Sequence, residues 1–318
     1  MKAVRIILKK ASIYLTTFIL LSMFSFYLFF VFPGDPATLI ARHKMGGEIP
    51  PPQIVENLKR ELKLNVSPYR LYIKWLRDFI QGDWGKSFLT GEPVLKEIKR
   101  HFVMTLYLTI STFAIAFPLS LITGVIAALK EGKRMDNLVL LFLITLDSTP
   151  SFFLGLTLMM LLGVKLRILP IAGSNSLKNA ILPALTLSAS YVAVTSRITR
   201  NSIIKTLKEE FILFAKAKGL PKWQIFRRHV FRNAMIPIVT YAGLELAWLF
   251  QGSAVVEKLF GWPGIGSLTV EAAMYKDLPL LQGCLMSIGT VFILINGITD
   301  LLYIAINPQL EETSDEIV

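Results

Sequence analysis

The sequence predicts an all-α membrane protein with six transmembrane helices, both termini in the cytoplasm and one large external segment after the first helix. The 318-residue chain is 53% hydrophobic and only 18% charged, whereas about a quarter of a soluble domain is charged. Its mean hydropathy is +0.55, and several uncharged runs are long enough to cross a bilayer. The net charge of +12 is typical of cytoplasmic loops rich in Lys and Arg. We therefore expect the chain to sit in a lipid bilayer and to bind no nucleic acid.

The first span is predicted at residues 11–32, an uncharged run that follows the basic stretch 1–10. It is too long for the apolar part of a signal peptide, and no cleavage site of small residues follows it, so we expect an uncleaved anchor helix. Five further spans are predicted at residues 102–129, 137–164, 180–196, 236–256 and 280–306. The run 180–196 is the weakest, because it is short and rich in Ser and Thr. Such a span is tolerated when it packs inside a bundle.

The distribution of Lys and Arg predicts the orientation of these spans. The connection 197–235 carries ten of them against two acidic residues, and the basic stretches 1–10 and 130–136 fall on the same side if there are six spans. Because basic loops stay in the cytoplasm, we expect this side to be cytoplasmic, together with the tail 307–318. The segment 33–101 is also basic, but a segment longer than about 60 residues crosses the membrane largely regardless of its charge. We therefore expect it outside.

One external stretch ends like a phosphate-binding loop. Residues 81–87 read QGDWGKS. A phosphate-binding loop also needs a glycine five positions before its second glycine, and a buried strand ahead of it. Ile80 occupies that position, and the residues before it have helical spacing. We interpret the stretch as a glycine-rich loop that closes a helix, and expect no nucleotide site there.

The rest of the external segment 33–101 predicts two short amphipathic helices. Apolar side chains recur there at helical spacing in two groups, after a rigid turn at residues 50–52. The first group is Ile54, Leu58, Leu62 and Leu64, and the second is Tyr72, Trp75, Leu76 and Phe79. We expect both helices to pack against the outer mouth of the bundle, and favour this packing role over a role in binding a ligand.

The cytoplasmic connection 197–235 is far longer than a helix–helix loop of about two to eight residues. Its pattern predicts a short helix that ends at Gly219, a favoured residue for a C-terminal cap. Pro221 then starts a second helix over about 221–234, because proline suits the first turn. The small residues Ala215, Ala217 and Gly219 leave room for another chain. A basic helix lying on anionic lipid is the alternative, but lipid binding needs no such break, so we favour docking of a cytoplasmic partner.

Ionisable side chains inside spans are costly, so they usually face an interior or water. Tyr241, Glu245 and Trp248 follow one another at i, i+4 and i+7, with Gln251 adjacent, on an otherwise apolar helix. This stripe indicates either a pathway surface, where the rings stack on a sugar or peptide and Glu245 accepts hydrogen bonds, or an interhelical hydrogen bond. Asp147 also lies in a predicted span. There we favour capping of the backbone that Pro150 frees.

The cysteine and the histidines of the chain indicate neither a disulfide nor a metal site. The one cysteine, Cys284, lies in an apolar run and has no partner in the chain for a disulfide. The three histidines, His43, His101 and His229, are far apart in the sequence. We expect no metal site.

Five stretches together resemble the permease subunits of ATP-binding-cassette importers of the dipeptide, oligopeptide and nickel type. In order, they are residues 33–37 (PGDPA), 82–87 (GDWGKS), 214–240 (FAKAKGLPKWQIFRRHVFRNAMIPIVT), 256–266 (VEKLFGWPGIG) and 300–308 (DLLYIAINP). The general importer signature begins with Glu-Ala-Ala, whereas Leu213, Phe214 and Ala215 stand there, so only Ala215 and Gly219 fit it. The peptide branch commonly lacks that glutamate.

The resemblance implies that the chain is one subunit of a transport complex in the plasma membrane of a prokaryote. Two permease subunits, the second of them usually a different chain, form the pathway through the five-helix core 102–306. Two cytoplasmic ATPases hold the ATP and Mg²⁺, so this chain is not an enzyme and binds no cofactor, and an external binding protein delivers the substrate. The implied coupling residues are Glu210, Phe214, Ala215, Ala217, Lys218, Gly219, Leu220 and Pro221. The implied external gate loop contains Glu257, Trp262, Pro263 and Gly264.

Two other functional classes compete with this interpretation. A proton-coupled carrier working alone would need no docking loop, so the break in 197–235 disfavours it. An intramembrane enzyme would need a catalytic constellation within the spans, and no histidine lies there. The substrate stays open among peptides, the family default, oligosaccharides and metal chelates.

Overall fold

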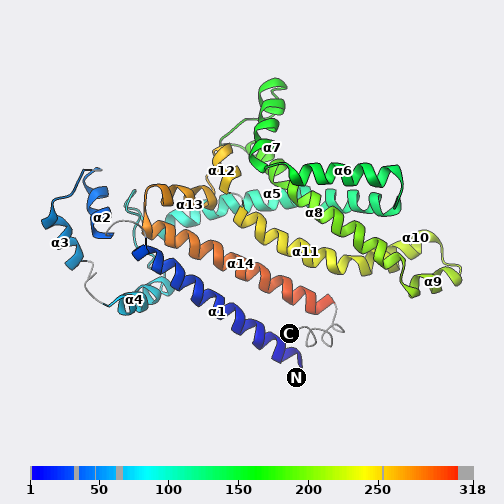
Figure 1. Ribbon diagram of the computed structural model, residues 1–318, viewed down its shortest axis with the longest axis horizontal. Coiled ribbons are helices and arrows are strands. Elements are labelled where there is room, and N and C mark those ends of the chain that lie inside the picture. The colour runs from blue at the N-terminus through cyan, green and yellow to red at the C-terminus, as the bar shows by residue number, and fades with distance from the viewer. Residues whose placement is uncertain (1, 32–35, 47, 62–66, 253, 307–318) are drawn as a thin grey trace. The chain divides into compact units, whose positions relative to one another are not determined.

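The computed structural model describes residues 2–31, 36–46, 48–61, 67–252 and 254–306 of the chain (Figure 1). Every regular element within these residues is a helix, and the only β-type pairing there is an isolated bridge between Lys86 and Pro93. The predicted all-α class is therefore confirmed. Residues 33–35, Leu62, Leu64 and the tail 307–318, which carried part of the sequence interpretation, lie outside the described residues.

The helices are distributed over two compact units that share the long helices α5 and α14. The first unit comprises residues 1–105 and 263–293, and the second comprises residues 106–262 and 294–318. The helices that belong to or begin in the first unit are α1 (Lys2–Val31), α2 (Pro36–Lys44), α3 (Pro52–Glu61), α4 (Pro68–Ile80), α5 (Val94–Leu129), α13 (Ile265–Met274) and α14 (Leu278–Ile306). Those of the second unit are α6 (Arg134–Ser148), α7 (Ser151–Leu158), α8 (Ile181–Leu207), α9 (Glu210–Ala217), α10 (Lys222–Ile225), α11 (Phe231–Gly252) and α12 (Ala254–Phe260).

Among the described residues, five helices are long and apolar enough to cross a membrane. They are Lys9–Leu28, Val94–Leu129, Leu177–Leu207, Lys222–Phe250 and Leu278–Leu301. A sixth span exists if α6 and α7 count as one, together with the π-helical turn Met159–Lys165 that follows α7. The structure thus supports five or six spans.

The predicted span 137–164 is not one continuous helix, because the chain bends by 102° between α6 and α7. The break falls at Thr149, which has an extended backbone, and Pro150, which precedes the first residue of α7. A proline disfavours helical backbone at the residue before it and has no N–H to donate. The physical reason was therefore visible in the sequence, but not the size of the bend.

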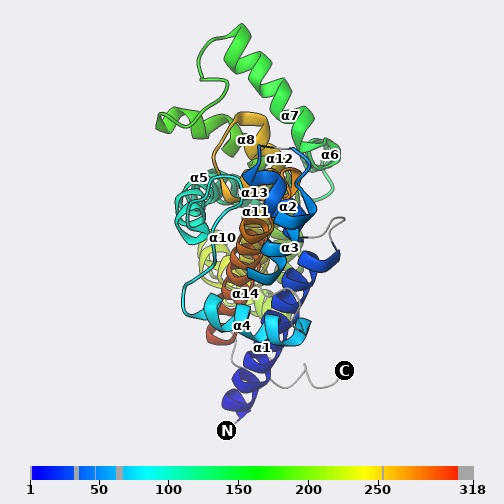
Figure 2. The same ribbon diagram turned by 90° about the vertical axis from the view of Figure 1, so that its left-hand side faces the viewer.

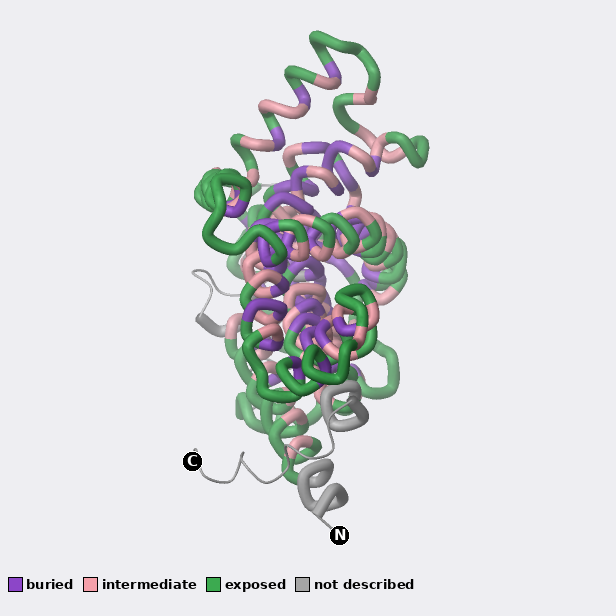
Figure 3. The backbone as a smooth tube through the Cα atoms, turned by 90° about the vertical axis from the view of Figure 1, so that its right-hand side faces the viewer, coloured by how far each residue is buried: buried purple, intermediate pink, exposed green. Residues whose placement is uncertain are grey.

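The span that looked weakest in the sequence is the most buried one. In an apolar 18-residue stretch of Leu177–Leu207, 61% of residues are buried, compared with 33% in such a stretch of Val94–Leu129. The buried hydroxyls of Thr186 and Thr199 donate to the carbonyls of Leu182 and Thr195, one turn earlier, at 2.8 Å each. The polar side chains are thus satisfied within the helix, which lets α8 pack against α6, α7 and α11. Along the other long helices, buried positions alternate with exposed ones (Figure 3).

In the first unit, α4 lies against α1, as both views show (Figures 1 and 2). The contact is aromatic: the ring of Phe26 lies 5.4 Å from that of Tyr72 and 5.6 Å from that of Trp75. The stack continues through Phe79 to Trp84, whose ring centroids are 4.2 Å apart. The predicted helices around Leu58 and Trp75 exist as α3 and α4, whereas the sequence interpretation missed α2.

The GKS stretch is a structural loop. Ser87 Oγ donates to the buried carboxylate of Asp277 at 2.5 Å, and the Leu89 backbone N–H donates to the same oxygen at 3.1 Å. The other Asp277 oxygen accepts from the N–H of Leu280, in the first turn of α14. Asp277 therefore joins the glycine-rich loop to the start of α14, and the hydroxyl of Ser87 is occupied by this contact.

Candidate functional site

The connection between α8 and α11 forms one end of the second unit (Figure 1). It is shorter than the predicted 197–235, because residues 197–207 continue α8 and residues 231–235 begin α11. The second predicted helix, 221–234, starts at Lys222 and runs through a π-helical turn, Phe226–Val230, directly into α11. Ile203 of α8 and Ala234 of α11 belong to one buried cluster. This packing explains why both helices extend beyond the uncharged runs of the sequence.

Gly219 ends α9 as the sequence predicts. Its φ of +74° is in the left-handed region, which costs a residue with a Cβ atom about 1–2 kcal/mol. The N–H of Gly219 donates to Lys216 O at 3.0 Å, and the N–H of Leu220 donates to Ala215 O at 3.3 Å. These two bonds define a Schellman cap. Pro221 lies one position earlier than expected, as the residue before the first turn of α10.

The connection has one face packed inward. Ile212, Ala215 and Ile225 are buried in a cluster with Ile203 of α8 and Val230, and Leu220 packs against that cluster. The interpretation of Ala215 as room for another chain is therefore wrong in this structure, because its methyl group packs inside the chain. The small side chain instead lets α9 lie close to its own core.

The opposite face is exposed and partly apolar. It consists of Leu213, Phe214, Ala217, Lys218, Gly219, Pro221 and Trp223, and is called the α9–α10 surface below. Phe214 is 62% exposed, and the Lys218 ammonium lies 4.5 Å from the centre of its ring. A Cβ atom added at Gly219 would meet nothing within 4 Å. Glu210, in the first turn of α9, is exposed as well.

A surface pocket borders the α9–α10 surface. It is lined by Pro221, Trp223, Gln224, Arg227 and Arg228. The indole of Trp223 stacks on Phe226 with ring centroids 6.4 Å apart, which fixes one wall. The surface thus offers exposed rings beside two arginines, a composition that suits contact with another protein.

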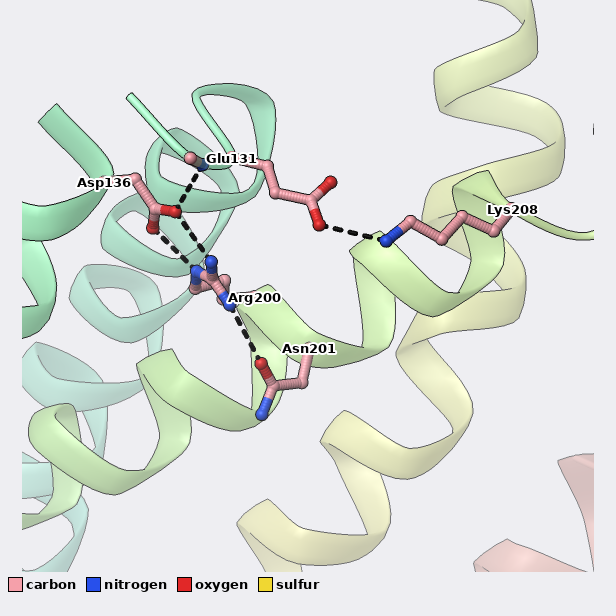
Figure 4. Close-up of polar contacts among 6 residues, drawn as sticks. Glu131, Asp136, Arg200, Asn201 and Lys208 are labelled. Atoms are coloured by element: carbon pink, nitrogen blue, oxygen red, sulfur yellow. Dashed lines mark hydrogen bonds and ion pairs between the residues drawn. The ribbon is translucent and has the colours of Figure 1, made fainter. Parts of the chain in front are cut away.

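The base of this region is fixed by an ion pair that the sequence interpretation missed (Figure 4). Arg200 of α8 holds both oxygens of Asp136 in α6, with Nε–Oδ1 at 2.7 Å and Nη2–Oδ2 at 2.6 Å. The Gly132 N–H donates to the same carboxylate at 2.9 Å, and Asp136 is almost fully buried. Lys208 and Glu131 make a second, exposed pair at 3.0 Å. The α5–α6 turn is thereby tied to α8 just ahead of α9.

The predicted stripe on α11 meets polar residues of two other helices. Tyr241 and Glu245 lie within electrostatic range of each other and of Asp147, and Trp248 is 59% exposed. The side chain of Gln251 lies outside the described residues. Asp147 does not cap the backbone at Pro150 as favoured above, because Arg197 Nη2 lies 2.6 Å from its Oδ2.

The predicted external gate residues fall in both units. In the second unit, Glu257 and Trp262 are buried, the Trp262 N–H donates to Glu257 O at 2.8 Å, and its ring stacks on Tyr107. In the first unit, Gly264 begins α13, and its carbonyl lies 3.3 Å from Nδ1 of His101. Pro263 is half-buried. The side chains of Glu257 and Trp262 therefore face inward rather than forming an open surface.

Two family profiles together match nearly the whole chain. The family described as "Binding-protein-dependent transport system inner membrane component" matches residues 120–312. The one described as "Binding-prot-dependent transport system membrane comp, N-term" matches residues 3–109.

Curated relatives match at similar length. The glutathione transport system permease protein GsiC of Escherichia coli strain K12 is 37% identical over 294 residues, which cover 92% of this chain and 94% of that protein. The protein of the same name from Shigella dysenteriae serotype 1 gives the same values.

Two solved structures share the fold. An inward-facing form of the MetNI methionine ABC transporter is 18% identical, with a TM-score of 0.57 over 68% of this chain and 99% of that chain. An amino acid ABC transporter with histidines is 15% identical, with a TM-score of 0.53 over 65% of this chain and 93% of that chain. At these identities the likeness concerns the fold alone.

Proposed function

The chain belongs to the family of binding-protein-dependent transport inner-membrane components and is a permease subunit of an ATP-binding-cassette importer, and from this premise we propose how its parts divide the work. It is a transport subunit and not an enzyme. The α9–α10 surface docks a cytoplasmic ATPase. The observation that carries this proposal is the Schellman cap at Gly219, which holds the exposed side chains of α9 and α10 on either side of an unobstructed break.

The complete importer contains a second permease subunit, two cytoplasmic ATPases and an external substrate-binding protein. ATP and Mg²⁺ bind to the ATPases, and this chain holds no cofactor. The chain crosses the plasma membrane of a prokaryote six times, with the bent α6–α7 pair as one span. Both termini and the α9–α10 surface lie in the cytoplasm, and residues 33–101 lie outside. The high density of Lys and Arg between α8 and α11 supports this orientation.

Motion of the docked ATPases reaches the spans through the inward face of the connection. Because Ile212 and Ala215 pack against Ile203 of α8, a push on α9 is transmitted to the most buried span. The bidentate pair between Arg200 and Asp136 carries the same displacement to the α5–α6 turn. The stripe Tyr241, Glu245 and Trp248 lines the substrate pathway. Peptides are the favoured substrate class, in keeping with the name of the 37% identical relative.

The test is substrate-stimulated ATP hydrolysis by the complete co-purified complex. Phe214→Ala removes an exposed ring from the α9–α10 surface, and Phe142→Ala on α6 is the matched control, because the two rings are 62% and 61% exposed. We expect Phe214→Ala to lower stimulated hydrolysis or the amount of ATPase that co-purifies, and Phe142→Ala to leave both unchanged. Transport by this chain in liposomes without ATPases would contradict the proposal and favour a carrier working alone.

A further inference from the structure

Polar side chains from three helices meet inside the second unit. Asp147 lies near the end of α6, Arg197 on α8 and Glu245 on α11. The Asp147–Arg197 pair is direct, and Glu245 lies within electrostatic range of Asp147. Tyr241, one turn before Glu245 on α11, lies within electrostatic range of Glu245 and of both members of the pair. None of these contacts was predicted from the sequence, which placed Arg197 in a loop.

The charges of this cluster do not balance. Arg197 is committed twice, since Nη2 donates to Asp147 at 2.6 Å and Nε donates to the Ala193 carbonyl at 3.2 Å. That pair is neutral. In the part of the chain that the structure describes, no Lys, Arg or His forms an ion pair with Glu245. One negative charge is therefore left over at Glu245.

The cluster does not face lipid. The side chains of Arg197 and Asp147 are 36% and 34% exposed, although both lie in spans. A charged pair open to hydrocarbon is costly, so this opening meets water or protein in the assembled importer. Trp248, less than one turn from Glu245, is exposed on the same stripe.

A buried hydroxyl beside the cluster also lacks a hydrogen-bond partner of normal geometry among the described residues. Tyr191 of α8 packs among Ala242 and Leu249 of α11, on either side of Glu245 in sequence, and lies within electrostatic range of Glu245. The Tyr191 hydroxyl and the Thr195 hydroxyl one turn further on are buried, and neither has a partner of normal geometry among the described residues. Buried polar groups are rarely left unpaired in this way. Both hydroxyls could bind a polar group that enters the cluster.

We propose that Glu245, with the hydroxyls of Tyr191 and Tyr241, binds the ammonium group of the transported molecule. An ammonium group is cationic and has three donors and no acceptor, which matches one unpaired carboxylate beside phenolic oxygens. The substrate class is therefore a molecule with a free primary amine, such as a peptide with an unblocked N-terminus, and not a neutral oligosaccharide. The inference rests on the proposed function, because it assigns the substrate of the same pathway.

The test compares three probes in proteoliposomes that contain the complete importer and its binding protein: trialanine, N-acetyl-trialanine and raffinose. Acetylation removes the ammonium charge and leaves the rest of the peptide intact. We expect the wild type to import trialanine in preference to both other probes. In Glu245→Gln the ratio of trialanine to N-acetyl-trialanine uptake falls about ten-fold or more, because a charge-assisted bond is replaced by a neutral one. Glu245→Asp keeps much of the preference.

The matched control is Glu92→Gln, which neutralises an exposed carboxylate in the first unit. It should leave the uptake ratio unchanged. A wild type without preference for the free amine, whichever probe it imports, would overturn the inference, as would an unchanged ratio in Glu245→Gln. Neither result contradicts ATP-driven import through docked ATPases, provided that uptake still requires ATP. Uptake without ATP would instead contradict the proposed function.

Discussion

Gly219 gives the sharpest test of the α9–α10 surface, because its substitution isolates a backbone effect. A Cβ atom at this position meets nothing within 4 Å, so Gly219→Ala introduces no clash. The whole cost comes from the φ of +74°, about 1–2 kcal/mol for a residue with a Cβ atom. If an ATPase docks only on the capped conformation, its affinity should fall by about five- to thirty-fold, at 1.4 kcal/mol for each factor of ten. Gly219→Asn should lose less, because Asn tolerates this region.

The assay is the dissociation constant of the purified ATPase for the permease pair in nanodiscs, measured for the wild type, Gly219→Ala and Gly219→Asn. We expect affinity to decrease from glycine to asparagine to alanine. Gly132→Ala is the control, since Gly132 also has a positive φ of +72° and open space around it but lies outside the α9–α10 surface. Equal affinity for wild type and Gly219→Ala would refute the reasoning, as would an equal loss in Gly132→Ala.

Two further predictions concern buried carboxylates. Arg200→Met leaves Asp136 buried without its cation and should lower the free energy of unfolding by about 3–5 kcal/mol. Lys208→Met, which breaks the exposed neighbouring pair, should cost less than about 1 kcal/mol. Both are measured by SDS titration in mixed micelles. Asp277→Ala removes the acceptor of three hydrogen bonds and should cost about 3 kcal/mol or more in the same titration, whereas Ser87→Ala should cost about 1–3 kcal/mol.

Different results would contradict each of these predictions. Equal losses of unfolding free energy in Arg200→Met and Lys208→Met would show that burial does not determine how much the Asp136–Arg200 pair stabilises the fold. Adding Asp136→Asn to Arg200→Met should recover part of the loss, because the buried charge disappears with its partner. If Asp277→Ala were as stable as the wild type, Asp277 would not hold the glycine-rich loop to α14.

The sequence was sufficient where a local pattern determines the structure. Uncharged runs predicted the long helices, and the left-handed cap at Gly219 followed from glycine's freedom at positive φ. Ile80 and the helical spacing before it predicted that the GKS stretch is a glycine-rich loop that closes a helix, and such a loop follows α4. In each case a few neighbouring residues decide the outcome.

The sequence was insufficient where the outcome depends on which helices meet. Whether Asp147 caps a helix end or pairs with a cation depends on Arg197, which is 50 residues away and reaches it only because α6 packs on α8. The burial of Ala215 depends likewise on the core of α8 and α11. Pro150 indicated a break, but the angle of 102° is set by tertiary packing.

Site-directed cross-linking tests the docking of an ATPase on the α9–α10 surface most directly. The only cysteine, Cys284, is buried and is first replaced by Cys284→Ala. Lys218→Cys then places a thiol on the α9–α10 surface. Lys178→Cys places one at an exposed site in residues 165–179, the connection between the third and fourth predicted spans, which we expect outside. A short bifunctional reagent is applied to membranes that contain the whole importer. The account predicts a product with the ATPase from Lys218→Cys and none from Lys178→Cys; no product from Lys218→Cys, or equal products from both, would contradict it.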